Sequence, residues 1–475
     1  MHAPADVLTR GHGKKRCRAV PTTSSEGPRR SHEIHSQARV DCCSGNQMTH
    51  EPDPTTAFCR RSLMAGWHYR DCHCDAVMIL TSLTRPSAPL ILACMKRQST
   101  GHQLAHYRAE FPIFQKKIYL NSCSLGALST RVEQRVTDYF REWHTRGASA
   151  WYDVWWQALS DLRVEYAQVI NAAASEIALH SSVSTATSVL ASAIDYRQRP
   201  RVVTTSLDFP TVAYQWLVKQ PAGVEVVTVE SPDGISVPLD DIADAVDDRT
   251  ALVATSHVFF TTGAIQDITA LASIAHERGA LCFVDAYQSV GQVPFEVHET
   301  GVDFLCAGGL KWLLGGPGIV FLYVREELVQ ELVPTVSGWF ANEHQFDFDP
   351  CEIRWHKDAR RFEQGTPSLA AVFAQLGGLG IIREIGVQTV REVVKDLTDD
   401  LINRATESGL KPKVAANPEE RAAIVMIPHA DPTSQVKRLA EAGIIADARP
   451  GHVRLSPFFY NVKEDNVAAI EVLRP

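Results

Sequence analysis

Residues 281–324 read LCFVDAYQSVGQVPFEVHETGVDFLCAGGLKWLLGGPGIVFLYV, which is two short apolar runs separated by a more polar segment. The runs Leu281–Ala286 and Gly318–Val324 are rich in β-branched and aromatic residues, which is typical of strands buried on both faces. Asp285 stands at the carboxyl end of the first run, and Lys311 lies in a glycine-rich turn before the second. The stretch therefore predicts two core strands, with an acidic side chain at the end of the first and a lysine in the turn before the second.

The same alternation extends toward the N-terminus. Strand candidates Arg201–Thr205, Val224–Val229 and Ala251–Val258 are separated by helical patterns such as Pro238–Val246 and Asp267–Arg278. Repetition of strand, helix and strand predicts an α/β fold, with a mostly parallel sheet sandwiched by helices in a large domain. Ligands of such sheets collect at the carboxyl ends of the strands, so polar residues there are the first site candidates.

The C-terminal part of the chain has a different pattern. It holds helical patterns at Ser368–Glu384, Gln388–Ser408 and about Thr433–Ala442, and strand patterns at Ala422–Ile427 and His452–Leu455. This predicts a smaller α+β domain at 335–475, a large domain at 160–334, and an N-terminal segment at 95–159 that bridges to the small domain.

Residues 1–94 show no sustained helical or strand period, and they contain seven of the eleven cysteines. Cys72-His73-Cys74 suggests a metal site, but no second ligand pair follows at the spacing of a zinc finger. A targeting peptide is a second interpretation, although Thr, Ser, Arg and Pro interrupt the apolar run that starts at Ala76. The interpretation that we favour is a disordered extension, or sequence upstream of a natural start at Met95.

Charge and cysteine usage narrow the class of protein. The net charge is -8, which gives no reason to expect binding to nucleic acid or to an anionic membrane. No apolar run reaches the length of a membrane span, and the cysteines after Met95 form no disulfide framework. We therefore expect a soluble, cytoplasmic protein without a metal site.

Lys311 and Asp285 carry the chemistry. A lone lysine is usually a solvated surface group, but Lys311 is flanked by glycines and apolar residues with no other charge nearby. Desolvation lowers the pKa of an amine, and a neutral amine attacks an aldehyde to form an imine. An acid at a strand end can keep a pyridine nitrogen protonated, which makes the ring an electron sink. Asp285 alone would be interpreted as a helix cap or metal ligand, but the pair favours a cofactor site.

These residues resemble class V of the fold-type-I pyridoxal-phosphate (PLP) enzymes, the superfamily of aminotransferases, cysteine desulfurases and kynureninases. The resemblance covers roughly residues 115–465 and rests on several motifs in the expected order. It implies that PLP is the cofactor and that Lys311 forms the imine with it. It also implies that Asp285 pairs with the pyridine nitrogen and that Gln288 lies near the ring hydroxyl.

Further motifs add binding residues through the same resemblance. The turn at 181–187 resembles the one that holds the cofactor phosphate, which implies Ser184 and Thr185. Asp208-Phe209-Pro210-Thr211 resembles the kynureninase loop whose aromatic residue, here Phe209, stacks on the ring. The segments 337–340 and 361–367 resemble those that approach a phosphate from the neighbouring subunit, which implies Trp339, Thr366 and a homodimer with shared sites. The segment 453–461 resembles the carboxylate-binding segment, which implies Arg454 as the anchor of an amino acid substrate.

Departures from the motifs guide the choice among members. A cysteine desulfurase needs a nucleophilic cysteine on a late loop, and no cysteine follows Cys351. Kynureninase is the most similar member in local motifs, although Gln288 replaces its usual His, and Phe259 and Phe260 occupy the positions where the superfamily has an Asn. The sequence thus predicts a PLP enzyme that abstracts the α-proton of an amino acid, as a kynureninase-like carbon–carbon or β-elimination lyase. A class V aminotransferase is the alternative, followed by a cysteine desulfurase and a non-catalytic PLP-binding protein.

Overall fold

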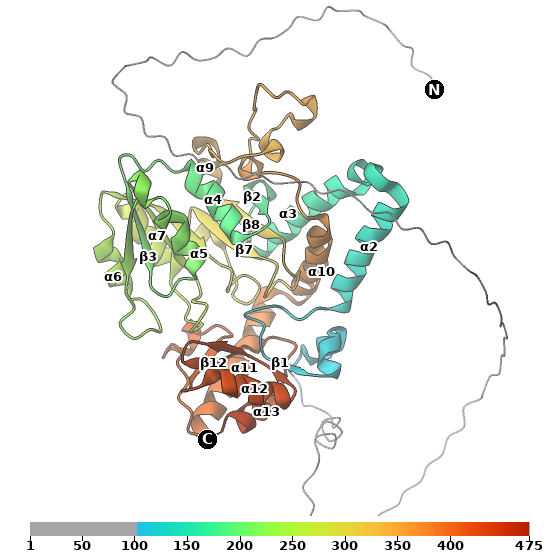
Figure 1. Ribbon diagram of the computed structural model, residues 1–475, viewed down its shortest axis with the longest axis vertical. Coiled ribbons are helices and arrows are strands. Elements are labelled where there is room, and N and C mark those ends of the chain that lie inside the picture. The colour runs from blue at the N-terminus through green and yellow to red at the C-terminus, as the bar shows by residue number, and fades with distance from the viewer. Residues whose placement is uncertain (1–101, 475) are drawn as a thin grey trace, which may run out of the picture. The chain divides into compact units, whose positions relative to one another are not determined.

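The computed structural model describes residues 102–474, so the predictions for residues 1–94 lie outside the described residues. The centre of this part is a seven-stranded sheet in the order β2-β8-β7-β6-β5-β3-β4 (Figure 1). Its strands are β2 Ile177–His180, β3 Arg201–Thr205, β4 Glu225–Val229, β5 Thr250–Ser256, β6 Leu281–Asp285, β7 Phe304–Gly308 and β8 Val320–Val324.

The sheet is mostly parallel, as the sequence predicts. The neighbours β7, β6, β5, β3 and β4 run parallel to one another, whereas β8 is antiparallel to both β7 and β2. Only residues 309–319 connect β7 to β8, and this connection is too short for the helical crossover that a parallel pair requires. The short connection is the glycine-rich turn that carries Lys311.

Helices cover both faces of the sheet, and alternate residues of each strand face opposite sides. In β8, Phe321 and Tyr323 pack in one core with α3, whereas Val320 and Leu322 pack in the other with α4 and α5. Phe321 stacks on Tyr166 of α3 with ring centroids 3.8 Å apart. The helices around the sheet are α2 Thr130–Arg146, α3 Trp156–Ile170, α4 Val183–Ala193, α5 Pro210–Leu217, α6 Leu239–Ala245, α7 Ile268–Glu277, α8 Val297–Thr300, α9 Glu326–Glu331 and α10 Leu369–Ile385.

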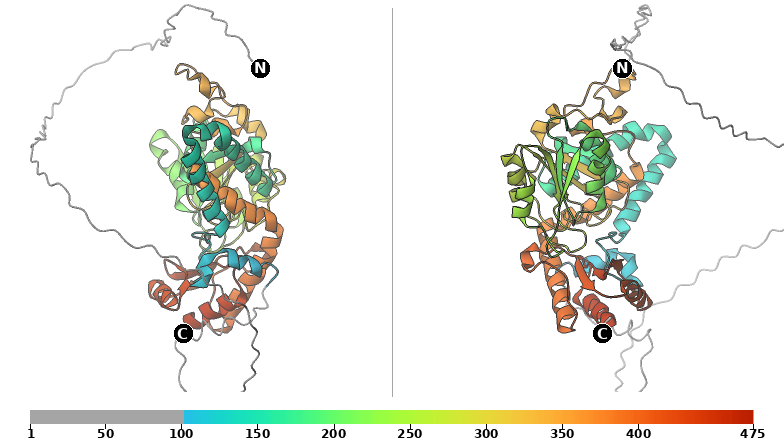
Figure 2. Two further views of the ribbon diagram at one scale, coloured as in Figure 1. Left: turned by 90° about the vertical axis from the view of Figure 1, so that its right-hand side faces the viewer. Right: turned by 60° about the vertical axis from the view of Figure 1, so that its left-hand side comes forward.

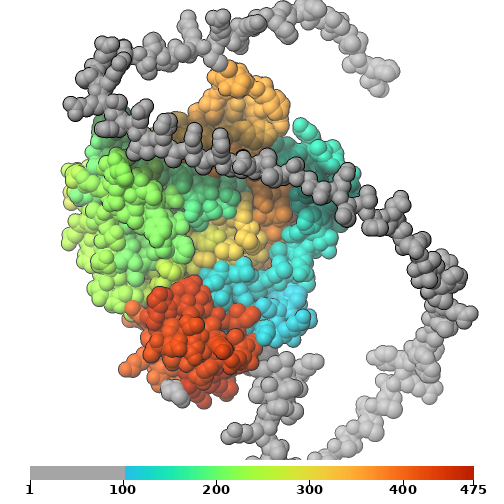
Figure 3. All heavy atoms as spheres, viewed as in Figure 1, coloured from blue at the N-terminus to red at the C-terminus, as the bar shows by residue number. Residues whose placement is uncertain are grey.

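A smaller α+β unit follows in the C-terminal part. It contains α11 Val387–Glu407, β9 Val425–Pro428, α12 Pro432–Glu441, β10 Ile444–Ile445, β11 Asp447–Arg449, β12 His452–Leu455 and α13 Lys463–Leu473. Strands β11, β12 and β9 form an antiparallel sheet in that order. Strand β1 (Ile118–Tyr119) pairs with β10, and Arg108 forms an ion pair with Asp465. The first described residues therefore pack on this unit, as Figure 3 shows.

The predicted elements agree well with the observed ones. All five strands predicted in the large domain are present, and their ends differ from the prediction by at most two residues. The helix predicted at 368–384 is α10, which lies beside α2 in each view (Figure 2). Strands β2 and β7 were not predicted, because β2 has only four residues and β7 runs directly into Gly308-Gly309. The proposed boundaries at residues 160 and 335 stay predictions.

Within residues 102–474, no single helix is long and apolar enough to cross a membrane. The bent pair α10 and α11 passes that test by length and composition only, and α10 is largely buried inside the protein.

Candidate active site

A cavity of about 480 Å³ lies at the carboxyl edge of the large sheet. Ser256 at the end of β5 and Asp285 at the end of β6 line it, and they are partners in the strand register. Ser181 follows β2, and Gly318 precedes β8. This is the edge at which α/β sheets collect ligands, and the volume suits a small-molecule site.

Lys311 lines this cavity on the turn between β7 and β8. Burial lowers the pKa of its amine to about 8, against smaller raising influences from Cys123 and Asp285. Its Nζ lies 4.7 Å from the centroid of the Tyr287 ring. Among the described residues no hydrogen bond or ion pair holds this amine. Because its pKa is about 8, part of the amine is neutral at neutral pH.

Asp285 is the carboxylate of the cavity wall. It is 6% exposed, and burial raises its pKa to about 6, partly opposed by a hydrogen bond from the Tyr287 amide and by the charge of Lys311. The Tyr287 N–H donates to Oδ1 at 2.9 Å. Oδ2 has no partner in the part of the chain that the structure describes, so it remains available to a positively charged N–H of a ligand.

The glycines around Lys311 serve protein packing. A Cβ on Gly308 would lie 2.2 Å from the Tyr287 ring, and one on Gly309 or Gly315 would overlap the Gln375 side chain. The Gln375 Nε2 donates to the Leu313 carbonyl at 3.0 Å, which ties the turn to α10. At these three positions, Tyr287 and Gln375 fill the space that a side chain would occupy.

The serine-rich turn after β2 forms one wall of the cavity. Ser181, Ser182 and Ser184 line it at the N-terminus of α4. Thr185 does not line it, because its hydroxyl lies 2.8 Å from the Ser182 Oγ and its amide donates to the same oxygen. Of the two residues predicted for the phosphate, the structure therefore brings Ser184 to the cavity, and Thr185 braces the turn.

Phe209 lines the cavity and is 45% exposed. The preceding Asp208 anchors its loop. The buried Asp208 carboxylate accepts hydrogen bonds from the amide and hydroxyl of Thr205, the Thr255 hydroxyl, and the amide and hydroxyl of Ser256, at 2.7–3.0 Å. These bonds fix the aromatic loop to the end of β5.

Arg454 on β12 reaches the cavity from the C-terminal unit. It is 1% exposed, and its Nη1 donates to the Phe260 carbonyl at 2.6 Å. Phe260 lines the cavity and meets Phe209 edge to face at 5.2 Å between centroids, whereas Phe259 is buried in the core. Phe260 is thus the aromatic residue that makes this wall apolar.

Gln288 lines the cavity, but protein groups use both ends of its amide. Its Nε2 donates to the Cys123 carbonyl at 3.0 Å, and its Oε1 accepts from the Trp312 indole at 2.9 Å. Cys123 belongs to the turn at 121–126, whose Gly126 amide donates to Leu310. Gln288 therefore holds this turn against the Lys311 segment, and one Nε2 hydrogen remains for a ligand.

Thr366 and Trp339 do not line the main cavity of this chain. Thr366 is exposed and lines an adjoining hollow of about 140 Å³ that shares Ser181 and Gly318 with the cavity. Trp339 is 42% exposed, and its turn packs on the Thr366 segment, because the Phe340 amide donates to the Gln364 carbonyl at 3.0 Å. The two predicted segments thus lie together on an exposed face.

Sequence reasoning missed several residues of the cavity wall. Those not proposed as site residues include Cys123, Ser124, Ser256, Tyr287 and Arg449. Arg449 had no signal in the sequence, because its strand β11 has only three residues.

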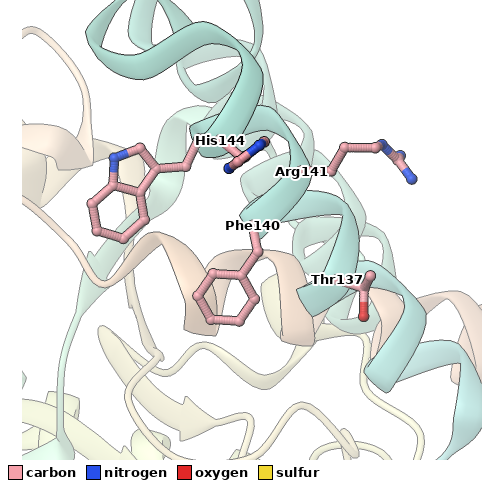
Figure 4. Close-up of a pocket in the computed structure, with 5 residues that line it drawn as sticks. Thr137, Phe140, Arg141 and His144 are labelled. Carbon is pink, nitrogen blue, oxygen red and sulfur yellow. The ribbon is translucent and has the colours of Figure 1, made fainter. Parts of the chain in front are cut away.

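A larger hollow of about 690 Å³ lies on α2 and is lined by Thr137, Phe140, Arg141, Trp143 and His144 (Figure 4). All of these residues belong to one helix, and they include no carboxylate. The hollow is therefore not an active-site candidate.

Comparison with known proteins identifies the family of the chain. Residues 118–471 match the family model of the class-V aminotransferases. The chain is 37% identical over 373 residues to the uncharacterized aminotransferase YcbU of Bacillus subtilis (strain 168), which covers 78% of this chain and 97% of that protein. It is 30% identical over 389 residues to the kynureninase of Shouchella clausii (strain KSM-K16), and the match covers 78% of this chain and 91% of that protein.

Solved structures share the fold. The apo structure of a cysteine desulfurase from Thermococcus onnurineus NA1 superposes with a TM-score of 0.71 and 22% identity, over 78% of this chain and 96% of that one. Since the family model covers most of the described residues, the chain belongs to the class-V aminotransferase family and is a PLP-dependent enzyme.

Proposed function

We propose that this protein is a lyase that acts on an amino acid, with kynureninase-like carbon–carbon cleavage or β-elimination as its reaction. The observation that carries the proposal is the single cavity in which the desolvated amine of Lys311, the buried carboxylate of Asp285 and the guanidinium of Arg454 meet. The kynureninase relative and the Phe-Pro-Thr loop support the lyase reaction over others of the family.

The residues of the cavity fit PLP. The hydroxyls of Ser181, Ser182 and Ser184, with the free amides at the start of α4, would hold a phosphate. Oδ2 of Asp285 would face the pyridine nitrogen, and the aldehyde would meet Lys311. When bound, the cofactor withdraws electrons from the carbon that carries the amino group.

The protein's own groups divide the remaining work. Arg454 binds the α-carboxylate and fixes the orientation of the amino acid. The Lys311 amine, with a pKa of about 8, takes the α-proton and returns it, because its neutral and charged forms are both populated near neutral pH. The rings of Phe209 and Phe260 keep water away from this side of the cavity.

An aminotransferase is the second candidate, favoured by the 37% identity to a protein named as one. Both reactions use the same residues up to removal of the α-proton. They differ afterwards: the lyase breaks a bond of the side chain, between the β- and γ-carbons or to the β-substituent, whereas the aminotransferase transfers the amino group to a keto acid.

We also propose a homodimer. Thr366 and Trp339 lie on an exposed face that continues along α2, since Trp143 and Thr366 line one hollow there. Trp143 and Phe140 of α2 are each 54% exposed. A second copy that covered this face would bury these aromatic side chains and would receive the Thr366 segment near its own serine-rich turn.

We place the enzyme in the cytoplasm, because the thiols of Cys282 and Cys306 are buried and unbridged.

The test uses the full chain supplied with PLP, L-kynurenine as substrate, and Lys311→Gln and Lys411→Gln variants. Bound cofactor gives a visible absorption band, and the lyase predicts that the band shifts on addition of L-kynurenine while alanine is released. Lys311→Gln should lose the band and the activity, whereas Lys411→Gln, at an exposed lysine, should keep both. A band shift with a keto acid product and no alanine would select the aminotransferase. Folded wild-type protein that binds no PLP would refute the proposal.

A further inference from the structure

Arg454 is less open to a ligand than an isolated carboxylate anchor would be. It is 1% exposed, and three of its donors are used by the Phe260 carbonyl, the Ser124 Oγ and the Asp447 Oδ2. Its Nε–H is buried and has no acceptor among residues 102–474. An unpaired buried donor is costly, so Arg454 carries one unsatisfied donor in addition to the three that protein groups already use.

A second guanidinium lines the same cavity. Arg449 lies on β11, two residues after Asp447, and its side chain is 29% exposed. Only its Nη1 is used, by the Asp447 Oδ1 at 2.7 Å and the Ala448 carbonyl at 2.9 Å. Within the described residues its Nε and Nη2 donors have no partner, so the fork of Arg449 is the more available of the two.

Asp447 joins the two arginines. It lies opposite Arg454 in the register of β11 and β12, and it also accepts from the Ser124 hydroxyl at 2.6 Å. Burial opposes its charge, but the Ser124 hydrogen bond and the charges of Arg454 and Arg449 lower its pKa, so it is ionised at neutral pH. The cluster of Arg449, Arg454 and Asp447 therefore carries one net positive charge.

That charge matches one carboxylate and no more. A single carboxylate brings the cluster to neutrality, whereas a second one beside it would leave an unpaired negative charge in a half-buried site. The wall next to the cluster is the Phe260 ring, with Phe209 against it. A substrate carboxylate in the cluster would thus have apolar surface beside it on this wall, and the other lysine or arginine that lines the cavity is Lys311, the residue that would hold the cofactor.

We infer that Arg449 is a second carboxylate-binding residue of this site, and that Asp447 limits the site to substrates whose only carboxylate is the α-carboxylate. This inference rests on the proposed function, which makes the substrate an amino acid. It adds that the side chain of that amino acid is uncharged. The buried Arg454 then supplies positive charge that orients the carboxylate, and Arg449 supplies the N–H groups that no protein group uses.

The experiment measures calorimetric titrations of the full chain, with and without PLP, at low ionic strength. The probes are propionate with one carboxylate, succinate with two, and propionamide with none. The variants are Arg449→Gln and Asp447→Asn. Arg197→Gln is the control, because Arg197 pairs with Asp195 at the same two-residue spacing on an exposed surface outside the cavity. Circular dichroism checks that each variant is folded.

Arg449→Gln should weaken propionate binding roughly tenfold, as expected for loss of one charged hydrogen-bonding partner, while Arg197→Gln leaves it unchanged. Asp447→Asn should raise the affinity for succinate relative to propionate by about fivefold, since the cluster then carries two net charges. Propionate binding that is equal in Arg449→Gln and wild type, or a succinate-to-propionate ratio that Asp447→Asn does not change, overturns the inference. Absence of the cofactor band in wild type is a separate result, which refutes the proposed function.

Discussion

The amine of Lys311 should react far more readily than an ordinary lysine. Its pKa of about 8 leaves roughly a quarter of it neutral at pH 7.5, against roughly 0.1% for a lysine at 10.5. Only the neutral form is nucleophilic, so the desolvated amine gains a factor of about 200 in reactive fraction. The cause is burial between Tyr287 and the sheet edge, opposed by Cys123 and Asp285.

The assay is competitive labelling of the PLP-free chain with trace acetic anhydride from pH 6 to 11, followed by peptide mapping. Labelling of Lys311 should rise with a midpoint near pH 8. Asp285→Asn should lower that midpoint, because the carboxylate stabilises the charged amine. Exposed Lys411 serves as an internal reference for reagent access. A midpoint near 10.5 for Lys311 would refute the argument that burial dominates its pKa.

Measurements of stability on substituted chains test the site and its support. Asp285→Asn should stabilise the PLP-free chain by about 3 kcal/mol above pH 6. Folding raises the pKa of the Asp285 carboxyl from 3.8 to about 6, so the wild type loses stability as the pH rises from about 4 to 6, and the variant does not. Denaturant curves should show no difference below about pH 4, and a difference that persists there would contradict this linkage. Asp208→Ala should cost about 2–4 kcal/mol in the same assay, since its five donors lose their buried acceptor, and a loss below 1 kcal/mol would mean that they find other partners. Gly378→Ala should lower the free energy of unfolding by about 1–3 kcal/mol, because the new methyl would lie 2.3 Å from the Leu313 carbonyl oxygen. The control is Gly380→Ala on the same helix, where the space is open and the effect should be neutral or stabilising. Equal effects of the two substitutions would disprove the close contact at Gly378.

The sequence predicted the sheet and its chemistry because those signals are local. Runs of β-branched residues mark strands buried on both faces, and a polar residue at the end of such a run has only one edge to occupy. Asp285 and Lys311 therefore could be assigned to one site without knowledge of the tertiary contacts. Arg454 was predicted from the resemblance of the segment 453–461 to a carboxylate-binding segment, and the structure places it on β12.

Other parts of the site depend on contacts that a sequence pattern does not contain. Arg449 reaches the cavity only because β11 pairs with β12, and the three residues of β11 have no apolar period. The sequence placed two phenylalanines near the site, but only the geometry at the end of β5 sends Phe260 to the cavity and Phe259 to the core. Thr185 was proposed as a ligand, yet its hydroxyl hydrogen-bonds with the Ser182 Oγ, which also caps the helix by accepting from the Thr185 amide.

The turn at 121–126 determines how early the site can form while the chain is being synthesised. It contacts the Lys311 segment on one side, and on the other its Cys123 amide donates to the Ser456 hydroxyl, 333 residues further along the chain. At about 5–20 residues per second, a ribosome needs roughly 17–67 s to make that interval. The turn therefore has its second partner only after residue 456 has been made. A nascent chain that has formed the large sheet but not yet residues 449–456 lacks the wall that carries Arg449 and Arg454, so it cannot yet capture a carboxylate substrate.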